Sequence, residues 1–130
     1  MMTDLIMAFK YSKFVSWVAS EIKKRPKISL KPGMLVSFAY NIQRDDNELD
    51  FTPLYILVEA KFQYLYGVNI FQLPKKFQDQ LIPLLSDNPD DNLRIAAEIR
   101  KNSNYRKAYK YYRMENIASR VMEIKIDDLK

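Results

Sequence analysis

The chain has 130 residues, of which 48% are hydrophobic, and this length fits a single domain, residues 1–130, around one modest core. It contains no cysteine and no histidine, which excludes disulfide frameworks, zinc sites built on those ligands, cysteine nucleophiles and Ser-His-Asp triads. The net charge of +5 favours an acidic partner, most often nucleic acid. Because the sequence lacks a long apolar run and a signal-peptide pattern, we expect a soluble, intracellular protein with no membrane contact.

The N-terminal segment, residues 1–25, is predicted to be a helix that runs over about 3–24. Its apolar face carries Tyr11, Phe14, Val15, Val18 and Ile22 at helical spacing. We expect the helix to end at Arg25, since the residue before a proline is disfavoured in helical conformation. The side chains that could anchor this helix to another protein are Leu5, Ile6, Phe9 and Trp17.

Three consecutive antiparallel strands, a meander, are predicted over residues 32–74. The stretch "MLVSFAY" follows a Pro-Gly turn and alternates in polarity, "PLYILVEA" is apolar on both faces, and "FQYLYGVNIFQLP" comes after a tight connection. Glycine weakens a strand unless a bend, a bulge or a close approach requires the missing Cβ. Gly67 therefore predicts a curled strand that pairs with two neighbours, as in a small barrel; the alternative is a ligand that approaches the backbone there.

Residues 75–116 are predicted to be helical. "KKFQDQLIPLLSD" has helical spacing with a break at Pro83, "DDNLRIAAEIRKN" forms a second helix, and "NYRKAYKYYRMENIASR" forms a third. "VMEIKIDDL" then alternates as a last strand, residues 120–127, able to close the sheet. The expected fold class is α+β: a small antiparallel β-barrel with an N-terminal helix and a helical insertion before the last strand.

The third predicted helix carries the strongest binding signal. At helical spacing its tyrosines form one stripe, and Arg106, Lys110 and Arg113 form a parallel one. Such cations and rings can neutralise phosphates and stack on bases; the alternative is a core-facing tyrosine stripe with a solvated basic flank. The candidate nucleic-acid-binding residues, including a first basic segment, are Arg100, Lys101, Arg106, Lys107, Lys110, Arg113, Lys23, Lys24 and Arg25.

No catalytic site emerges from the sequence. A metal-dependent nuclease built on Asp50, Glu59 and Lys61 is disfavoured because nine positions of extended chain would separate its carboxylates by roughly 30 Å. The acidic loop "RDDNELD" lacks the glycine of a calcium loop. We therefore expect a non-enzymatic protein with no metal, no cofactor and no small-molecule substrate.

Two stretches resemble small virion proteins of tailed bacteriophages, the DNA end protector and its relatives. "PGMLVSFAYNIQ", "FTPLYILVEA" and "YGVNIFQLP" follow one another in that family's order, and "YRKAYKYYRMENIASRVMEIKIDDL" is similar to its end, so that the match covers residues 32–129. The resemblance implies an SH3-like barrel that binds phage DNA or DNA ends, or sits at the head-to-tail junction.

The same resemblance implies a place in the virion, or in the host cytoplasm during assembly, with phage DNA and other virion proteins as partners. Two alternatives stay open. One is an architectural neck, tail or baseplate subunit with protein-only contacts. The other is a small nuclease or a regulator of a host enzyme, which rests on fold analogy.

Overall fold

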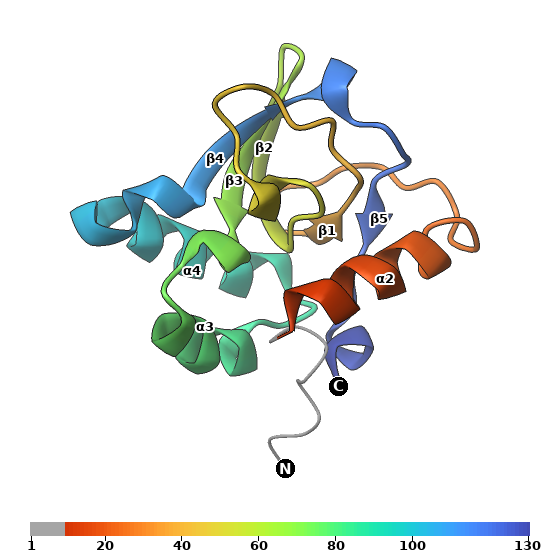
Figure 1. Ribbon diagram of the computed structural model, residues 1–130. Helices are drawn as coiled ribbons and strands as arrows, with labels where there is room; N and C mark the ends of the chain where they lie inside the picture. Colours follow the sequence, from red (N-terminus) through yellow and green to blue (C-terminus); the bar gives the residue numbers. More distant parts are fainter. Residues whose placement is uncertain (1–9) are drawn as a thin grey trace.

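The computed structural model describes residues 10–130 (Figure 1), so the predicted anchors Leu5, Ile6 and Phe9 lie outside the described residues. The protein is α+β, with a five-stranded antiparallel sheet in the order β4-β3-β2-β1-β5. The strands are β1 (Leu35–Ser37), β2 (Tyr55–Lys61), β3 (Tyr64–Asn69), β4 (Tyr109–Arg113) and β5 (Met122–Glu123). The helices are α2 (Tyr11–Glu21), α3 (Lys75–Leu81) and α4 (Pro89–Lys101), with short 3-10 turns between elements. None of the described helices is long and apolar enough to cross a membrane.

The predicted meander is confirmed as β1, β2 and β3, but the last strand is shorter than expected. β5 pairs with β1 through Val36 opposite Glu123 and Ser37 opposite Met122, and the chain then enters a 3-10 turn, Ile126–Leu129. In the part of the chain that the structure describes, β4 and β5 lie at the two edges of an open sheet. An isolated bridge between Tyr40 and Ile117 draws the segment after β1 toward the segment after β4.

The helical prediction for residues 75–116 is right in its first two parts. α3 ends at Leu81 and a 3-10 turn follows, with Pro83 at its start, because proline cannot continue the α-helical hydrogen-bond ladder. α4 begins after Asn88, whose side chain accepts a hydrogen bond from the backbone N–H of Asp90. The helix thus has both a side-chain cap and a proline in its first turn, which are strong start signals.

The predicted third helix is wrong. Residues 103–108 form a 3-10 helix, and 109–113 form strand β4, which pairs with β3. The sequence "YKYYR" is rich in tyrosine, a good strand former, and its side chains can alternate between two faces as well as follow a helical stripe. Because β3 needs a partner on its second edge, pairing decides in favour of the strand.

Both faces of the sheet are covered, and each cover has its own core. α2, α3 and α4 pack on one face around side chains such as Phe14, Ile56 and Val68. On the other face, the loops before and after β1 and the segment after β4 enclose an aromatic cluster. This cluster consists of Phe38, Tyr40, Tyr55 and Tyr112, in edge-to-face contacts. The far tip of the β2–β3 hairpin projects beyond the helices (Figure 1).

Gly67 lies where two strands and a tyrosine ring converge. A Cβ on this residue would sit 2.1 Å from the carbonyl oxygen of Ile56 and 3.0 Å from the Cζ of Tyr55. The Tyr55 ring passes the glycine, and its hydroxyl donates a hydrogen bond of 2.7 Å to the carbonyl of Lys110. β3 pairs here with β2 and with β4, as predicted, and the register against β2 shifts between Leu57 and Glu59. The neighbouring strand, and not a ligand, occupies the space left by the missing side chain.

Candidate nucleic-acid interface

Arg25, a candidate DNA contact, is engaged within the protein. Its guanidinium donates hydrogen bonds of 2.9 Å to both carboxylate oxygens of Asp128 and of 3.0 Å to Glu21, and it also lies 5.4 Å from the ring centroid of Trp17. These contacts, which we call the Arg25 clasp, tie the end of α2 to the C-terminal turn. Trp17 packs partly buried against the core below it. Arg25 and Trp17 therefore have structural roles, and little of their surface is available to a partner.

The Arg25 clasp predicts an acid-sensitive contribution to stability. The hydrogen bond from Arg25 holds the pKa of Glu21 below its usual value. Burial alone raises the pKa of Asp128, but the hydrogen bonds from Arg25 and from the backbone of Lys125 outweigh it, so the net shift is downward. Carboxyl groups with lowered pKa values stabilise the fold above their unfolded-state pKa values, near 4, and this stabilisation is lost as the pH falls through the folded values.

We expect Arg25→Met to lower the free energy of unfolding by about 1 to 2 kcal/mol at pH 7, and by clearly less at pH 2. Urea denaturation of both proteins at the two pH values measures the difference. Lys24→Met is the matched control, because Lys24 contacts the same Glu21 at 3.6 Å but is 69% exposed. If Arg25→Met lowered the free energy of unfolding equally at both pH values, the ion pairs with Glu21 and Asp128 would not be the source of the stabilisation.

Lys110 is also committed to the protein. Its Nζ lies 3.3 Å from Asp50 and 3.8 Å from Asp46. Asp50 is fully buried and accepts further hydrogen bonds from the Tyr112 hydroxyl, the Gln72 side chain and the backbone N–H of Asn47. We call Lys110, Asp46, Asp50 and Tyr112 the loop anchor, because together they fix the acidic loop to β4. Burial and the Asp50 charge raise the pKa of Tyr112, so its hydroxyl stays a donor.

The predicted cationic stripe is therefore corrected. Arg106 lies in the 3-10 helix, whereas Lys110 and Arg113 lie in β4 on opposite faces, because strand side chains alternate. The other candidates are spread over the surface. Arg100 stacks over Tyr109 at 5.0 Å, and Lys101 lies 3.7 Å from Glu98. The remaining exposed candidates are Lys23, Lys24 and Lys107.

The structure instead brings together three tyrosines that the sequence did not join. Tyr64 and Tyr66 lie in β3 and Tyr111 lies in β4, on the same face, since Tyr66 pairs opposite Tyr111. Their ring centroids are 5.5 to 6.3 Å apart. Tyr111 is 62% exposed, whereas Tyr64 and Tyr66 are half-buried. We call Tyr64, Tyr66 and Tyr111 the tyrosine platform. The period-two spacing of Tyr109, Tyr111 and Arg113 was the available signal for it.

Cations border the tyrosine platform at one end. Lys61 and Arg113 pair on either side of Tyr64 in the strand register, and the Arg113 guanidinium lies 5.7 Å from the Tyr64 ring centroid. Lys61 also contacts the ring of Phe62, which is 80% exposed in the hairpin turn and has φ of 55°. The row of Lys61, Tyr64 and Arg113, which we call the charged row, gives this part of the sheet a positively charged end.

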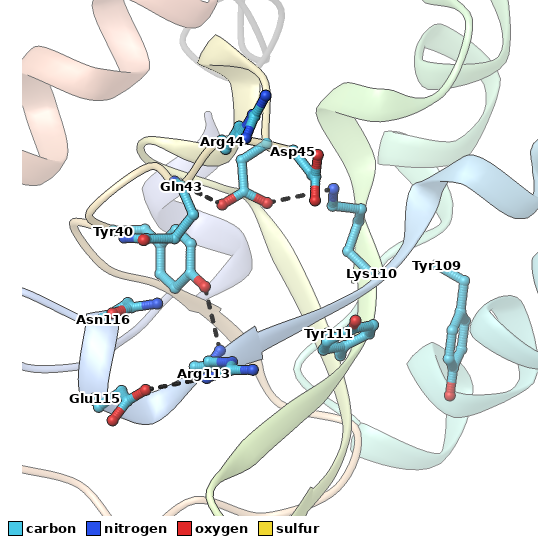
Figure 2. Close-up of a pocket in the computed structure, with 11 residues that line it drawn as sticks. Tyr40, Gln43, Arg44, Asp45, Tyr109, Lys110, Tyr111, Arg113, Glu115 and Asn116 are labelled. Carbon is cyan, nitrogen blue, oxygen red and sulfur yellow. Dashed lines mark hydrogen bonds and ion pairs between the residues drawn. The ribbon is translucent and has the colours of Figure 1, made fainter.

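A groove of about 500 Å³ runs beside the tyrosine platform, along β4 and the acidic loop (Figure 2). Tyr111 and Arg113 lie on one wall, and Arg44 and Asp45 come from the loop. The Tyr40 hydroxyl accepts a hydrogen bond from the Arg113 backbone N–H, and the Arg113 side chain lies 3.3 Å from Glu115. Among residues 10–130, no group of three or more acidic side chains is placed to hold a metal ion.

The fold and this surface define an α+β protein with an exposed aromatic and basic sheet face. Comparison with protein-family models, with curated proteins and with solved structures finds no match. The contacts and charges of the described residues therefore carry the functional argument.

Proposed function

We propose that this protein is a non-enzymatic DNA-binding protein of a tailed bacteriophage, present in the virion, that holds DNA at the tyrosine platform and its charged row. The observation that carries the proposal is the conjunction of a tyrosine cluster, in which Tyr111 is exposed, with two exposed cations on one sheet face. Rings of this kind stack on bases, and adjacent cations neutralise phosphates. The phage assignment and the virion location rest on the sequence resemblance.

We further propose that the sheet is a partly open SH3-like barrel. Four strands follow one another as antiparallel neighbours, and the fifth returns to the first. A 3-10 turn, Met114–Asn116, precedes that return, and the bridge between Tyr40 and Ile117 joins the segment after β4 to the segment after β1. The helical insertion between β3 and β4, together with α2, covers one face.

The test compares three double variants that each remove two positive charges. Lys61→Ala with Arg113→Ala removes the cations of the charged row. Arg106→Ala with Lys107→Ala removes the cations of the 3-10 helix Ser103–Ala108. Lys76→Ala with Arg94→Ala, on α3 and α4, is the control. We expect the first alone to weaken DNA binding, measured by fluorescence anisotropy, by tenfold or more. It should also reduce the slope of log affinity against log salt by about 1.4 to 1.8, the value for two lost phosphate contacts.

Each contrary result has a defined meaning. A loss of DNA affinity confined to the Arg106 and Lys107 variant would place the DNA contact at the 3-10 helix Ser103–Ala108. Absence of DNA binding by the wild-type protein at low salt would favour the architectural virion subunit with protein-only contacts. Cleavage of DNA or RNA in the presence of magnesium would favour the nuclease, and we expect none.

A further inference from the structure

We infer that the tyrosine platform selects unpaired DNA: single-stranded bases stack on Tyr111 and Tyr66 while the phosphates follow the charged row. This inference rests on the proposed function and specifies the form of the DNA. It starts from the exposure of ring surface. Tyr111 is 62% exposed and Phe62 is 80% exposed, and both belong to an ordered sheet or its turn. An exposed aromatic ring held in this way can stack on the face of an unstacked base.

Bases paired in a duplex cannot stack on the tyrosine rings. In a duplex the base faces are stacked on one another, and the grooves offer base edges and not faces. A duplex would therefore contact Lys61 and Arg113 through phosphates but would leave the tyrosine rings without a stacking partner. Single-stranded DNA can use both kinds of contact at once, and each base stacked on an aromatic ring adds appreciably to affinity.

The strand register places the two kinds of contact in adjacent rows. Lys61, Tyr64 and Arg113 form the charged row. The next row consists of Glu59, Tyr66 and Tyr111, and its exposed carboxylate disfavours phosphate there. The phosphates are thus directed to the charged row and the bases to the rings of Tyr66 and Tyr111. Same-face neighbours along a strand are about 6.6 Å apart, so the two rows lie within the reach of one nucleotide.

The ion pair of Arg113 with Glu115 does not prevent this use. Its two side chains are 56% and 66% exposed, and exposed ion pairs hold their partners weakly. The Arg113 side chain can exchange Glu115 for a phosphate while the Tyr64 ring stays beside it. The adjoining groove along β4 then leaves open space next to Tyr111, where the single-stranded DNA can continue.

Competition between two circular DNAs tests the inference without the complication of ends. Circular single-stranded DNA, relaxed covalently closed duplex and, for comparison, linear duplex, all of the same sequence, compete with a labelled single-stranded oligonucleotide for the protein. We expect the single-stranded circle to compete at a nucleotide concentration at least tenfold lower. Equal competition by the two circles would overturn the inference, as would competition by linear duplex but by neither circle, which would indicate a terminal base pair as the ligand.

Variants at Tyr111 test the stacking contact itself. Tyr111→Ala should weaken single-stranded binding by about tenfold or more, and Tyr111→Phe should retain it, because the ring is kept. Phe51→Ala removes another exposed ring, outside the tyrosine platform, and should leave binding unchanged. If Tyr111→Ala binds single strands normally while the Lys61 and Arg113 double variant does not, stacking is refuted and the proposed DNA-binding function stands. If none of the DNAs binds the wild-type protein, the proposed function itself fails.

Discussion

Gly67→Ala is expected to lower the free energy of unfolding by about 3 kcal/mol or more. The new Cβ would lie 2.1 Å from a backbone atom, the carbonyl oxygen of Ile56, and 3.0 Å from the Tyr55 ring. A flexible side chain could move aside, but a carbonyl in the middle of a strand pair can move only with its strand. The shift would disturb the β2–β3 pairing and the hydrogen bond from Tyr55 to Lys110.

Urea denaturation followed by circular dichroism measures this effect. Ala60→Gly is the matched control: it makes the reverse change at an exposed position of β2 and should cost about 1 kcal/mol or less. A loss of under 1 kcal/mol for Gly67→Ala would mean that the two strands can separate freely at this point. The close approach would then not explain the glycine.

Lys110→Met is expected to cost about 3 kcal/mol. The substitution keeps most of the apolar stem but removes the ammonium group 3.3 Å from the fully buried Asp50. A buried carboxylate that loses its cation is left with an uncompensated charge, whose penalty exceeds the value of the pair itself. The remaining donors, Tyr112, Gln72 and the backbone N–H of Asn47, hydrogen-bond to Asp50 but do not neutralise it.

A double-mutant cycle separates the charge effect from lost packing. In the Lys110→Met background, Asp50→Asn removes the uncompensated charge and should recover part of the stability, whereas Asp50→Asn alone should destabilise the protein. Lys101→Met, at an exposed position on α4, should stay within about 0.5 kcal/mol of the wild type. Simple additivity of the two substitutions would contradict the loop anchor as described.

The loop anchor also affects how DNA-binding experiments are read. A triple alanine variant of Arg106, Lys110 and Arg113 would test a helix that does not exist, and its loss of Lys110 would weaken the fold. Reduced binding by that variant could then reflect unfolding as readily as a lost DNA contact. The Lys61 and Arg113 pair avoids this difficulty, because both side chains are exposed.

Local signals in the sequence were sufficient for much of the fold. The meander follows from alternation and turn residues, and α4 follows from its proline, its capping Asn88 and its apolar spacing. The helix prediction for residues 104–116 was wrong because the segment carries two patterns at once. Tyr105, Tyr109 and Tyr112 have helical spacing, whereas Tyr109, Tyr111 and Arg113 have the spacing of one face of a strand. The strand forms because its backbone pairs with the second edge of β3. That requirement depends on the folded sheet and cannot be seen in a single sequence.

The candidate site was harder to predict because its contacts are distant in sequence. Arg25 and Asp128 are 103 positions apart, and Tyr112 and Asp50 are 62 apart. A charge run shows that cations are present but not which carboxylates they meet in the fold. The tyrosine platform likewise depends on the register that sets Tyr111 opposite Tyr66, which follows only after β4 is known to be a strand.

The position of Trp17 gives the protein a built-in optical probe. It is the single tryptophan of the chain, and it contacts the Arg25 guanidinium from α2, which lies away from the tip of the β2–β3 hairpin (Figure 1). Its emission should therefore respond when the C-terminal turn is released from α2, yet remain steady when an oligonucleotide occupies the distant sheet face. A change in this emission thus reports release of the C-terminal turn from α2, and DNA binding alone should not produce one.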